Sequence, residues 1–424
     1  MILEKIKIQF AQTEKRKILN NFFSLTALQL SNYIIPLMTL PYLTRVLGPE
    51  KYGLTAFAQA FIQYFILITD FGFNLSATRE IAINRESDEK VSRIFSSVIT
   101  IKIFLLILSF FTLIIIIFNV PKFSADSDLY YLTFLSVIGS TLFPQWFYQG
   151  IEKMKFIAIF SVSAKAFFTL GIFIFIKEPG DYLWLPILNS LGFIVSGLIG
   201  VLFPFLFLGV KYITPNYQEI KYQFKEGWHI FISTVSINLY TTSNTVLLGI
   251  FTNNVIVGYY TAAERIFRAV QFLGMPIYQA IFPHFSKLII EDKNRAISQF
   301  NRMFRYTMII TFIISGILSI GSHYFILNII GSGYEPSVLI FSVLSWVIFV
   351  SWGNYTLGIQ GMVNFGYKEV FSKIVVIFGL VHIIVATILI NNCSFISVAF
   401  VWLFTESAIF SYEYYFLKKH KILI

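Results

Sequence analysis

The chain has 424 residues, of which 56 % are hydrophobic and only 13 % are charged. A soluble domain carries about a quarter of its residues as charges, and the mean hydropathy here is +0.73, so the composition excludes a soluble globular enzyme and indicates a membrane-embedded protein. The formal net charge of +10 would suit a nucleic-acid surface only if the cations lay together. The single cysteine, Cys393, excludes an intramolecular disulfide and a cysteine metal cluster.

The chain begins with a short basic segment that leads into the first apolar run. No small-residue cleavage site follows this run, so we expect the first span to remain in the mature protein. A helix needs about 20 apolar residues to cross a bilayer. Windows of this length predict twelve spans, near 22–44, 53–75, 96–118, 129–149, 156–176, 183–208, 229–250, 259–283, 306–328, 338–360, 371–390 and 396–417.

The distribution of Lys and Arg between the connections predicts the orientation of these spans. The side of the membrane that holds the N-terminus carries 24 of the 32 cations, and the opposite side carries 4. The positive-inside rule therefore places both termini in the cytoplasm and makes the number of spans even. The positive charge thus reflects topology, and we expect no nucleic-acid partner. The remaining cations, which fall inside predicted spans, are Lys102, Lys165, Arg265 and Arg268.

The connections are too short for a soluble domain, since the longest, near 209–228 and 284–305, have about 20 residues each. This excludes most membrane-anchored enzymes and receptors. A faint internal repeat divides the chain near residue 210. Gly53 matches Gly258 at an offset of 205, segment 92–95 matches 301–304 at 209, and Gln149-Gly150 matches Gln360-Gly361 at 211. We therefore predict two parallel six-helix halves, 1–210 and 211–424, with a transport path between them.

Polar residues inside two of the predicted spans form stripes on one helix face. The stripe of the eighth span spreads over about 80° and consists of Thr261, Glu264, Arg268, Gln271 and Gln279. The stripe of the second span spreads over about 60° and consists of Gln59, Gln63, Asp70 and Asn74. The offset of 205 pairs Gln59 with Glu264 and Gln63 with Arg268. Arg265 lies at the edge of the stripe in the eighth span.

These stripes have two interpretations. Exposure to lipid is excluded, because one charged side chain at mid-bilayer costs about 2.5–3.5 kcal/mol even on the lenient insertion scale. The stripes either line a hydrated central cavity or hold helices together, with Glu264 and Arg268 forming an i,i+4 pair. Two matched stripes, together with Lys102 and Lys165, favour the cavity.

The charges in the spans indicate what such a cavity would bind. Against the four cations stand the acids Asp70, Glu264 and Glu406, so the lining is slightly positive. Arg and Lys donors would suit an anionic head group such as a phosphate or pyrophosphate. Lys102 has an alternative to a position in the cavity, because its amine could extend to the cytoplasmic surface.

Cofactor and metal motifs are missing from the sequence. The chain contains no HExxH, no Walker loop and no glycine-rich dinucleotide fingerprint, so we expect no cofactor, no metal and no use of ATP by the chain itself. His323 and His382 each lie among apolar residues, which favours packing over a proton relay. Repeated transport in one direction would then need another energy source, and ion exchange, with Asp70 or Glu264 changing protonation or binding a cation, is the simplest candidate.

Several sequence blocks resemble a known family. The segment Pro36–Gly53 (PLMTLPYLTRVLGPEKYG) is followed by 69–78 (TDFGFNLSAT), and 150–155 (GIEKMK), 263–268 (AERIFR) and 279–283 (QAIFP) also fit. These blocks are similar to those of the Wzx-type O-antigen flippases, within the multidrug/oligosaccharidyl-lipid/polysaccharide exporter superfamily. The resemblance covers nearly the whole chain.

The resemblance implies an all-α integral membrane protein with twelve transmembrane helices in two six-helix bundles, the MATE-like architecture. It also implies that an undecaprenyl-pyrophosphate-linked oligosaccharide moves from the cytoplasmic to the periplasmic leaflet of the bacterial inner membrane. The polymerase and chain-length regulator of O-antigen synthesis are candidate partners beside the membrane lipids. The cationic cavity of the family maps onto Lys102, Lys165, Arg265 and Arg268, and we add Gln59 and Gln63 as sugar-binding candidates.

Two other functions remain open. An exporter of cationic drugs would share the fold, but its site should be dominated by carboxylates, whereas the spans here hold more cations than acids. An integral glycosyltransferase or O-antigen polymerase would be expected to carry a large external loop with catalytic residues, which the predicted topology lacks. We therefore expect a flippase and not an enzyme.

Overall fold

The structure is a computed structural model that describes the backbone of residues 2–423. Side chains are described except for residues 2–23, 25, 233, 236, 237, 239, 240, 275–277, 279, 280, 283 and 284, so the basic N-terminal segment and Gln279 lie outside the described side chains. The described chain contains helices and no strand: α1 Ile2–Asp70, α2 Phe73–Asn84, α3 Asp88–Asn119, α4 Pro121–Ser124, α5 Ser127–Leu142, α6 Gln145–Gly150, α7 Lys155–Phe175, η1 Pro179–Leu183, α8 Trp184–Phe207, α9 Tyr217–Thr241, α10 Ser243–Phe251, α11 Asn254–Phe272, α12 Met275–Glu291, α13 Lys293–Ile320, α14 Ser322–Phe325, η2 Ile326–Ile330, α15 Pro336–Asn354, η3 Tyr355–Val363, α16 Lys368–Asn392 and α17 Ser397–Lys419. The predicted all-α membrane protein is confirmed.

Seven helical segments of the described residues are long and apolar enough to cross a membrane: Thr26–Asn84, Asp88–Asn119, Lys155–Phe175, Pro179–Phe207, Lys293–Ile320, Pro336–Val363 and Lys368–Asn392. Each coincides with one or two of the spans predicted from the sequence. The total of twelve spans stays a prediction.

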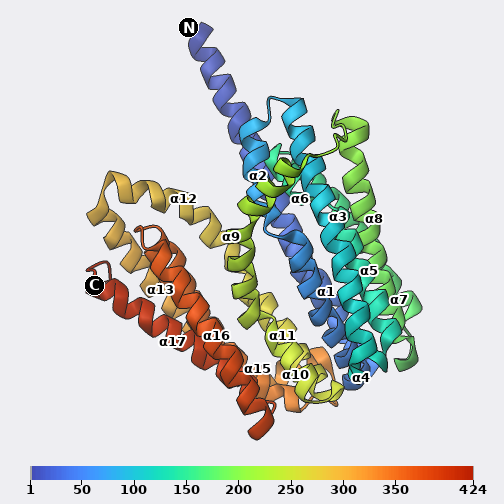
Figure 1. The fold of residues 1–424 in the computed structure, drawn as a ribbon. Coiled ribbons are helices and arrows are strands. Elements are labelled where there is room, and N and C mark those ends of the chain that lie inside the picture. The colour runs from blue at the N-terminus through green and yellow to red at the C-terminus, as the bar shows by residue number, and fades with distance from the viewer. Residues whose placement is uncertain (1, 424) are drawn as a thin grey trace. The chain divides into compact units, whose positions relative to one another are not determined.

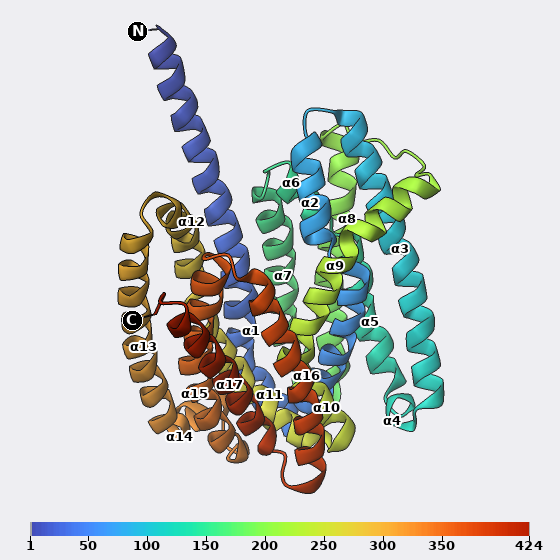
Figure 2. The same cartoon turned by 60° about the vertical axis from the view of Figure 1, so that its left-hand side comes forward.

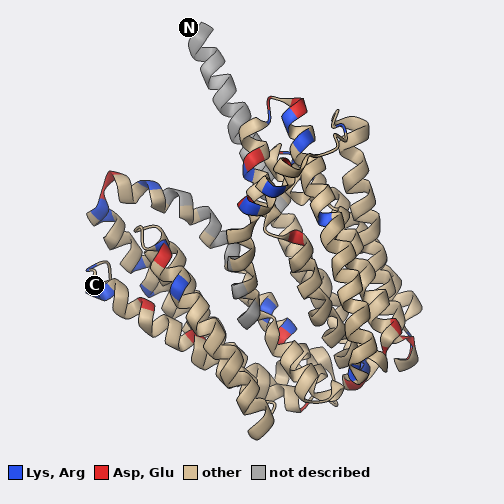
Figure 3. Cartoon of the chain, in the orientation of Figure 1, with Lys and Arg blue, Asp and Glu red and all other residues tan. Residues whose placement is uncertain are grey.

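The outer faces of these helices are suited to lipid. Six of the large apolar side chains exposed on α3 follow the three- and four-residue spacing of a helix: Phe104, Ile107, Leu108, Phe111, Ile115 and Phe118. This spacing places the six side chains on one helix face, and a soluble protein rarely exposes a large contiguous apolar patch. Figure 3 shows charged residues at the helix ends of the unit that contains α3 and α8, whereas Lys102 and Lys165 lie inside α3 and α7; α8 carries no charge along its length. The fold therefore places these apolar faces where a membrane would cover them.

The chain divides into two compact units. Unit 1 comprises Met1–Ile35 and Phe61–Thr234, and unit 2 comprises Pro36–Ala60 and Val235–Ile424. In unit 1, α8 packs against both α5 and α7 (Figure 1). In unit 2, α15 packs against α11, α13 and α17, and α17 also packs against α16 (Figure 2). These units are defined by contacts, and the halves 1–210 and 211–424 stay a prediction about the sequence repeat.

The connection expected between the first two spans is a break at a single residue. Gly48 has a left-handed φ of 67° with ψ of 173°, and it interrupts the long helix α1 directly before Pro49. A residue with a side chain rarely adopts this conformation, whereas glycine does so readily. The predicted spans near 22–44 and 53–75 lie on either side of this break.

The two glycines matched by the internal repeat lie against each other within unit 2. A Cβ on Gly53 would stand 1.8 Å from the Asn254 carbonyl oxygen and 2.5 Å from the Gly258 nitrogen. A Cβ on Gly258 would stand 2.1 Å from the Pro49 carbonyl oxygen. Only glycine permits backbones to approach this closely.

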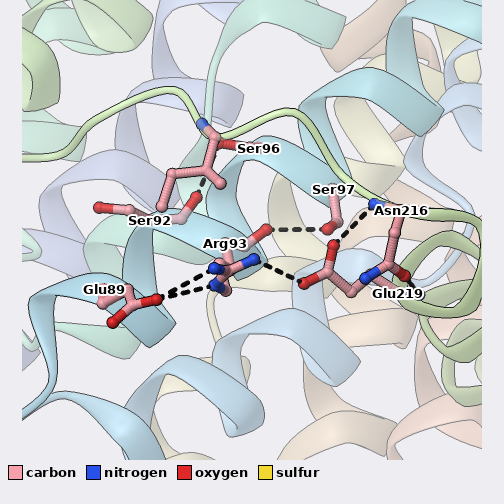
Figure 4. A network of polar contacts seen from close by, with 8 residues as sticks. Glu89, Ser92, Arg93, Ser96, Ser97, Asn216 and Glu219 are labelled. Carbon is pink, nitrogen blue, oxygen red and sulfur yellow. Dashed lines mark hydrogen bonds and ion pairs between the residues drawn. The ribbon is translucent and has the colours of Figure 1, made fainter.

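The segment that leads from α8 into α9 is fastened to α3 by a polar network (Figure 4). The Ser92 and Ser96 hydroxyls accept the backbone N–H groups of Lys211 and Ile213 at 3.1 and 2.9 Å. The Arg93 guanidinium donates to Glu89 and, at 3.4 Å, to Glu219 near the start of α9. Solvent screens these half-exposed ion pairs, and the Arg93–Glu89 pair lies within α3, so the attachment consists of the hydroxyl–backbone bonds and the Arg93–Glu219 pair.

Candidate functional site

Unit 1 contains a cavity of about 170 Å³ between its helices. Its polar lining comes from the side chains of Asn32, Asp70, Asn74, Gln145, Lys165 and Asn189, and its apolar lining includes Phe143, Phe168 and Phe193. These residues belong to α1, α2, α6, α7 and α8, except Phe143, which follows the end of α5. Polar side chains are costly inside membrane helices unless they face protein or water. Their convergence on one space makes this cavity the candidate binding site of unit 1.

A charge pair closes one side of this cavity. Lys102 on α3 is 1 % exposed, and its Nζ donates to Asp70 Oδ1 at 2.9 Å. The Asn74 amide donates to the other carboxylate oxygen at 3.2 Å. Asp70 is 28 % exposed and lines the cavity, whereas Lys102 lies behind it. The alternative that Lys102 reaches the cytoplasmic surface is therefore wrong in this structure, because its amine turns inward to a carboxylate.

Lys165 lies directly at the cavity. It is on α7, and its Nζ donates to Asn32 Oδ1 at 3.1 Å. A Cβ on Gly192 of α8 would lie 3.8 Å from the Lys165 Cα, so α8 passes close to this part of α7. The Lys165 amine and the neighbouring amides give the cavity both donors and acceptors of hydrogen bonds.

In unit 2 the stripe predicted for the eighth span contains an internal ion pair. Arg268 donates from Nε and from a terminal nitrogen to Glu264 Oε1, at 3.0 and 2.7 Å. The same guanidinium donates to the Thr241 carbonyl and lies 5.0 Å from the centre of the Trp402 ring. Thr245 donates to Glu264 Oε2 at 3.1 Å. The i,i+4 pairing anticipated for these two residues is thus present, and neither is fully buried.

Arg265 and Gln59 meet although they are 206 residues apart in the chain. An Arg265 terminal nitrogen donates to Gln59 Oε1 at 3.0 Å, and its guanidinium lies 5.6 Å from the centre of the Tyr52 ring. The repeat paired Gln59 with Glu264, so the contact falls one residue later on the same helix. Gln63 belongs to unit 1 and is half-buried. Gln271 donates to Ser351 Oγ at 3.1 Å and joins α11 to α15.

Apart from Gln63, the predicted site residues fall into two groups. Unit 1 gathers Asp70, Lys102 and Lys165 around its cavity, and unit 2 gathers Gln59, Glu264, Arg265 and Arg268 on one side of α11. Sequence reasoning missed the amides Asn32, Gln145 and Asn189 that line the cavity. Each lies inside a predicted span, and a scan of the spans for amide side chains would have found them.

Sequence comparison identifies relatives of the chain. The model of the polysaccharide biosynthesis protein family matches residues 18–289. A protein of Escherichia coli strain K12 is 31 % identical over 412 residues, which cover 97 % of this chain and 99 % of that protein. A protein of Shigella dysenteriae is 32 % identical over 61 % of this chain and 65 % of that protein. Both bear the name "Putative O-antigen transporter".

Structural comparison identifies the fold. The lipid II flippase MurJ, in its inward closed conformation, superposes with a TM-score of 0.71 at 17 % identity, over 93 % of this chain and 87 % of that one. An outward-facing multidrug resistance MATE family transporter superposes with a TM-score of 0.60 at 13 % identity, over 94 % and 96 % of the two chains. The expected likeness to the MATE fold is confirmed, and the count of twelve helices stays a prediction. Since the family model matches over half of the chain and the Escherichia coli relative aligns with nearly all of it, the chain belongs to the polysaccharide biosynthesis protein family, a family of membrane transporters and not of enzymes.

Proposed function

We propose that the chain is a flippase for an undecaprenyl-pyrophosphate-linked O-antigen oligosaccharide. It moves this lipid from the cytoplasmic to the periplasmic leaflet of the bacterial inner membrane by alternating access, with both termini in the cytoplasm. The names of the two relatives and the likeness to the MurJ fold support this proposal. The observation that carries it is the cavity of unit 1, which combines a lysine with several amides.

The chemistry of the cavity fits both parts of such a substrate. Amide side chains offer a donor and an acceptor each, as sugar hydroxyl groups require. The Lys165 amine would bind a phosphate oxygen as a point charge. The phenylalanines of the lining offer apolar surface to the sugar rings or the first part of the lipid.

In unit 2, Arg265 and Arg268 are the proposed phosphate ligands. Their planar guanidinium groups suit paired phosphate oxygens. Arg268 would exchange its bonds to Glu264 for bonds to the substrate. Asp70 and Glu264 are the proposed coupling acids, because protonation of either would release the cation that it holds, Lys102 or Arg268.

A vesicle experiment tests the transport reaction. The purified protein is reconstituted with an undecaprenyl-pyrophosphate-linked oligosaccharide that carries a fluorescent sugar, and an impermeant quencher is added outside. Protein-free vesicles should lose only the signal of the outer leaflet, whereas vesicles with the protein should lose nearly all of it. A signal equal to that of protein-free vesicles, combined with uptake of a cationic dye, would contradict the flippase and identify an exporter of cationic compounds.

The Arg268–Glu264 pair provides a second test, in cells. Arg268→Ala is expected to lower surface polysaccharide per unit of membrane protein by at least about tenfold, since a hydrogen bond to a charged group contributes about 1.5–3 kcal/mol. Arg268→Lys keeps the charge and should retain part of the activity. Arg295→Ala, on an exposed arginine of α13, is the matched control and should leave the activity unchanged.

The double variant Arg268→Ala with Glu264→Gln separates substrate binding from helix packing. If Arg268 only neutralises Glu264, the double change removes both charges and restores transport. We expect the double variant to stay inactive at normal membrane abundance. Restored polysaccharide would assign the pair to packing between helices.

A further inference from the structure

Helix α17 carries two buried acids, Glu406 and Glu413, outside both groups of site residues. Glu413 is fully buried, and neither of its carboxyl oxygens has a hydrogen-bond partner among the described residues. The acids counted from the sequence omit it, although it lies inside the span predicted near 396–417. Its neighbours along the buried face of α17, one turn away on each side, are Ile409 and Leu417, both part of an apolar core cluster.

The facing helix leaves space for this carboxyl group. A Cβ on Gly358 would stand 2.7 Å from Glu413 Oε1 and 2.4 Å from the Phe371 ring, so the carboxyl and a phenyl ring together occupy the place of a side chain. Gly358 lies in η3, a π-helical stretch that continues α15. π-Helical turns occur frequently at functional sites. Figure 2 shows α15, α16 and α17 side by side within unit 2.

Glu406, two turns earlier on the same face of α17, differs from Glu413 in its surroundings. Its Oε2 accepts from the Asn354 amide at 2.5 Å, and its Oε1 accepts from the Trp402 indole at 3.4 Å. Arg268 of α11 lies over the Trp402 ring, which brings a cation to this end of the row. Glu406 therefore has donors and a nearby positive charge, whereas Glu413 faces a glycine and a phenyl ring.

The other elements packed on α17 supply few charges to Glu413. From α16, His382 reaches α17 through Thr405, with Nδ1 at 3.0 Å from Oγ1. From α13, Phe304 packs against Phe410 and Tyr414. Glu406 is thus the nearest acid along the row, and its charge opposes a charge on Glu413.

We propose that Glu413 is a proton-binding site of this chain, occupied in the present conformation. A bare carboxylate in apolar surroundings without hydrogen-bond donors is strongly disfavoured, and such a group takes up a proton instead. A metal ion would need several oxygen ligands, whereas the Glu413 carboxyl group lies against Gly358, which is close to the Phe371 ring. The ligand at Glu413 is therefore a proton and not sodium.

This site deepens the proposed flippase, on which its role in transport rests. Alternating access changes the packing of helices, and water that reaches α17 in another conformation would let Glu413 release its proton. A proton bound in one state and released in the other shifts the balance between the two states. Glu413 would then couple a proton gradient to the direction of transport, in addition to the candidate acids Asp70 and Glu264.

Infrared spectroscopy of the purified protein tests the bound proton directly. At neutral pH the wild type should show the carbonyl stretch of a protonated carboxylic acid, which shifts in heavy water. Glu413→Gln should remove this band without changing the unfolding temperature, because a neutral amide replaces a neutral acid. Glu291→Gln, on an exposed acid of α12, is the matched control and should keep the band. A band that survives Glu413→Gln, or that only Glu406→Gln removes, overturns the proposal.

Transport in vesicles tests the coupling. An imposed proton gradient should raise the initial flipping rate of the wild type, and a sodium gradient should not. The Glu413→Gln variant should flip the labelled lipid at the rate that the wild type has without a gradient. Its rate should be the same with and without the proton gradient. A Glu413→Gln variant that responds as the wild type does overturns the coupling role. If the wild type flips no oligosaccharide, the proposed function fails, and the infrared band still decides whether Glu413 binds a proton.

Discussion

Lys165→Glu is expected to abolish surface polysaccharide while the protein inserts at normal abundance. The Lys165 amine lies at the cavity of unit 1, within hydrogen-bond distance of Asn32. A carboxylate at this place would repel a pyrophosphate and remove a donor. Since a charge-assisted hydrogen bond contributes about 1.5–3 kcal/mol, the loss alone lowers transport by about tenfold or more, and the repulsion adds to it. Surface glycan per unit of membrane protein is the measurement.

The end of the same helix offers a matched control. Lys177 follows α7, is exposed, and does not line the cavity. Lys177→Glu makes the same charge change and should leave surface polysaccharide near the wild-type level. Lys165→Arg keeps the positive charge and should retain a measurable fraction. If Lys165→Glu supports polysaccharide as well as Lys177→Glu does, the cavity does not bind the charged part of the substrate.

Asp70→Asn is expected to cause the largest loss of stability among the charge variants. Lys102 is 1 % exposed and donates to Asp70, so the change leaves a buried amine without its carboxylate. Breaking a buried ion pair in this way costs about 3–5 kcal/mol. Lys102→Met should cost less, because the remaining Asp70 is 28 % exposed at the cavity and also accepts from Asn74. The unfolding temperature in detergent and the abundance in the membrane are the measurements.

The double variant Asp70→Asn with Lys102→Met distinguishes a pair from two independent residues. With neither charge present, most of the stability lost in Asp70→Asn should return. Costs that simply add, or equal costs for the two single variants, would contradict the buried pair. Restored stability without restored transport would further indicate that the charges act in function as well as in folding.

The sequence by itself determined the class of protein and located several of its helices, although the single span predicted near 259–283 is two helices, α11 and α12. The apolar run predicted near 96–118 lies inside α3, Asp88–Asn119, and the run near 371–390 lies inside α16, Lys368–Asn392. Such runs can be located because the length and apolar character that a bilayer requires are local properties of the chain. The sequence also identified Lys102 and Arg268 as unusual, because a charge inside a span needs a partner wherever the helix packs.

Only the tertiary structure decided which partners these charges have. Lys102 pairs with Asp70 from another helix, and Lys165 meets Asn32 at a separation of 133 residues. It also decided that Glu413, unlike Glu406, faces a glycine and a phenyl ring. The pattern of one helix shows which residues share a face, but not which helix lies opposite. That depends on how ridges and close glycine contacts from distant segments fit together, as Gly53 and Gly258 do in unit 2.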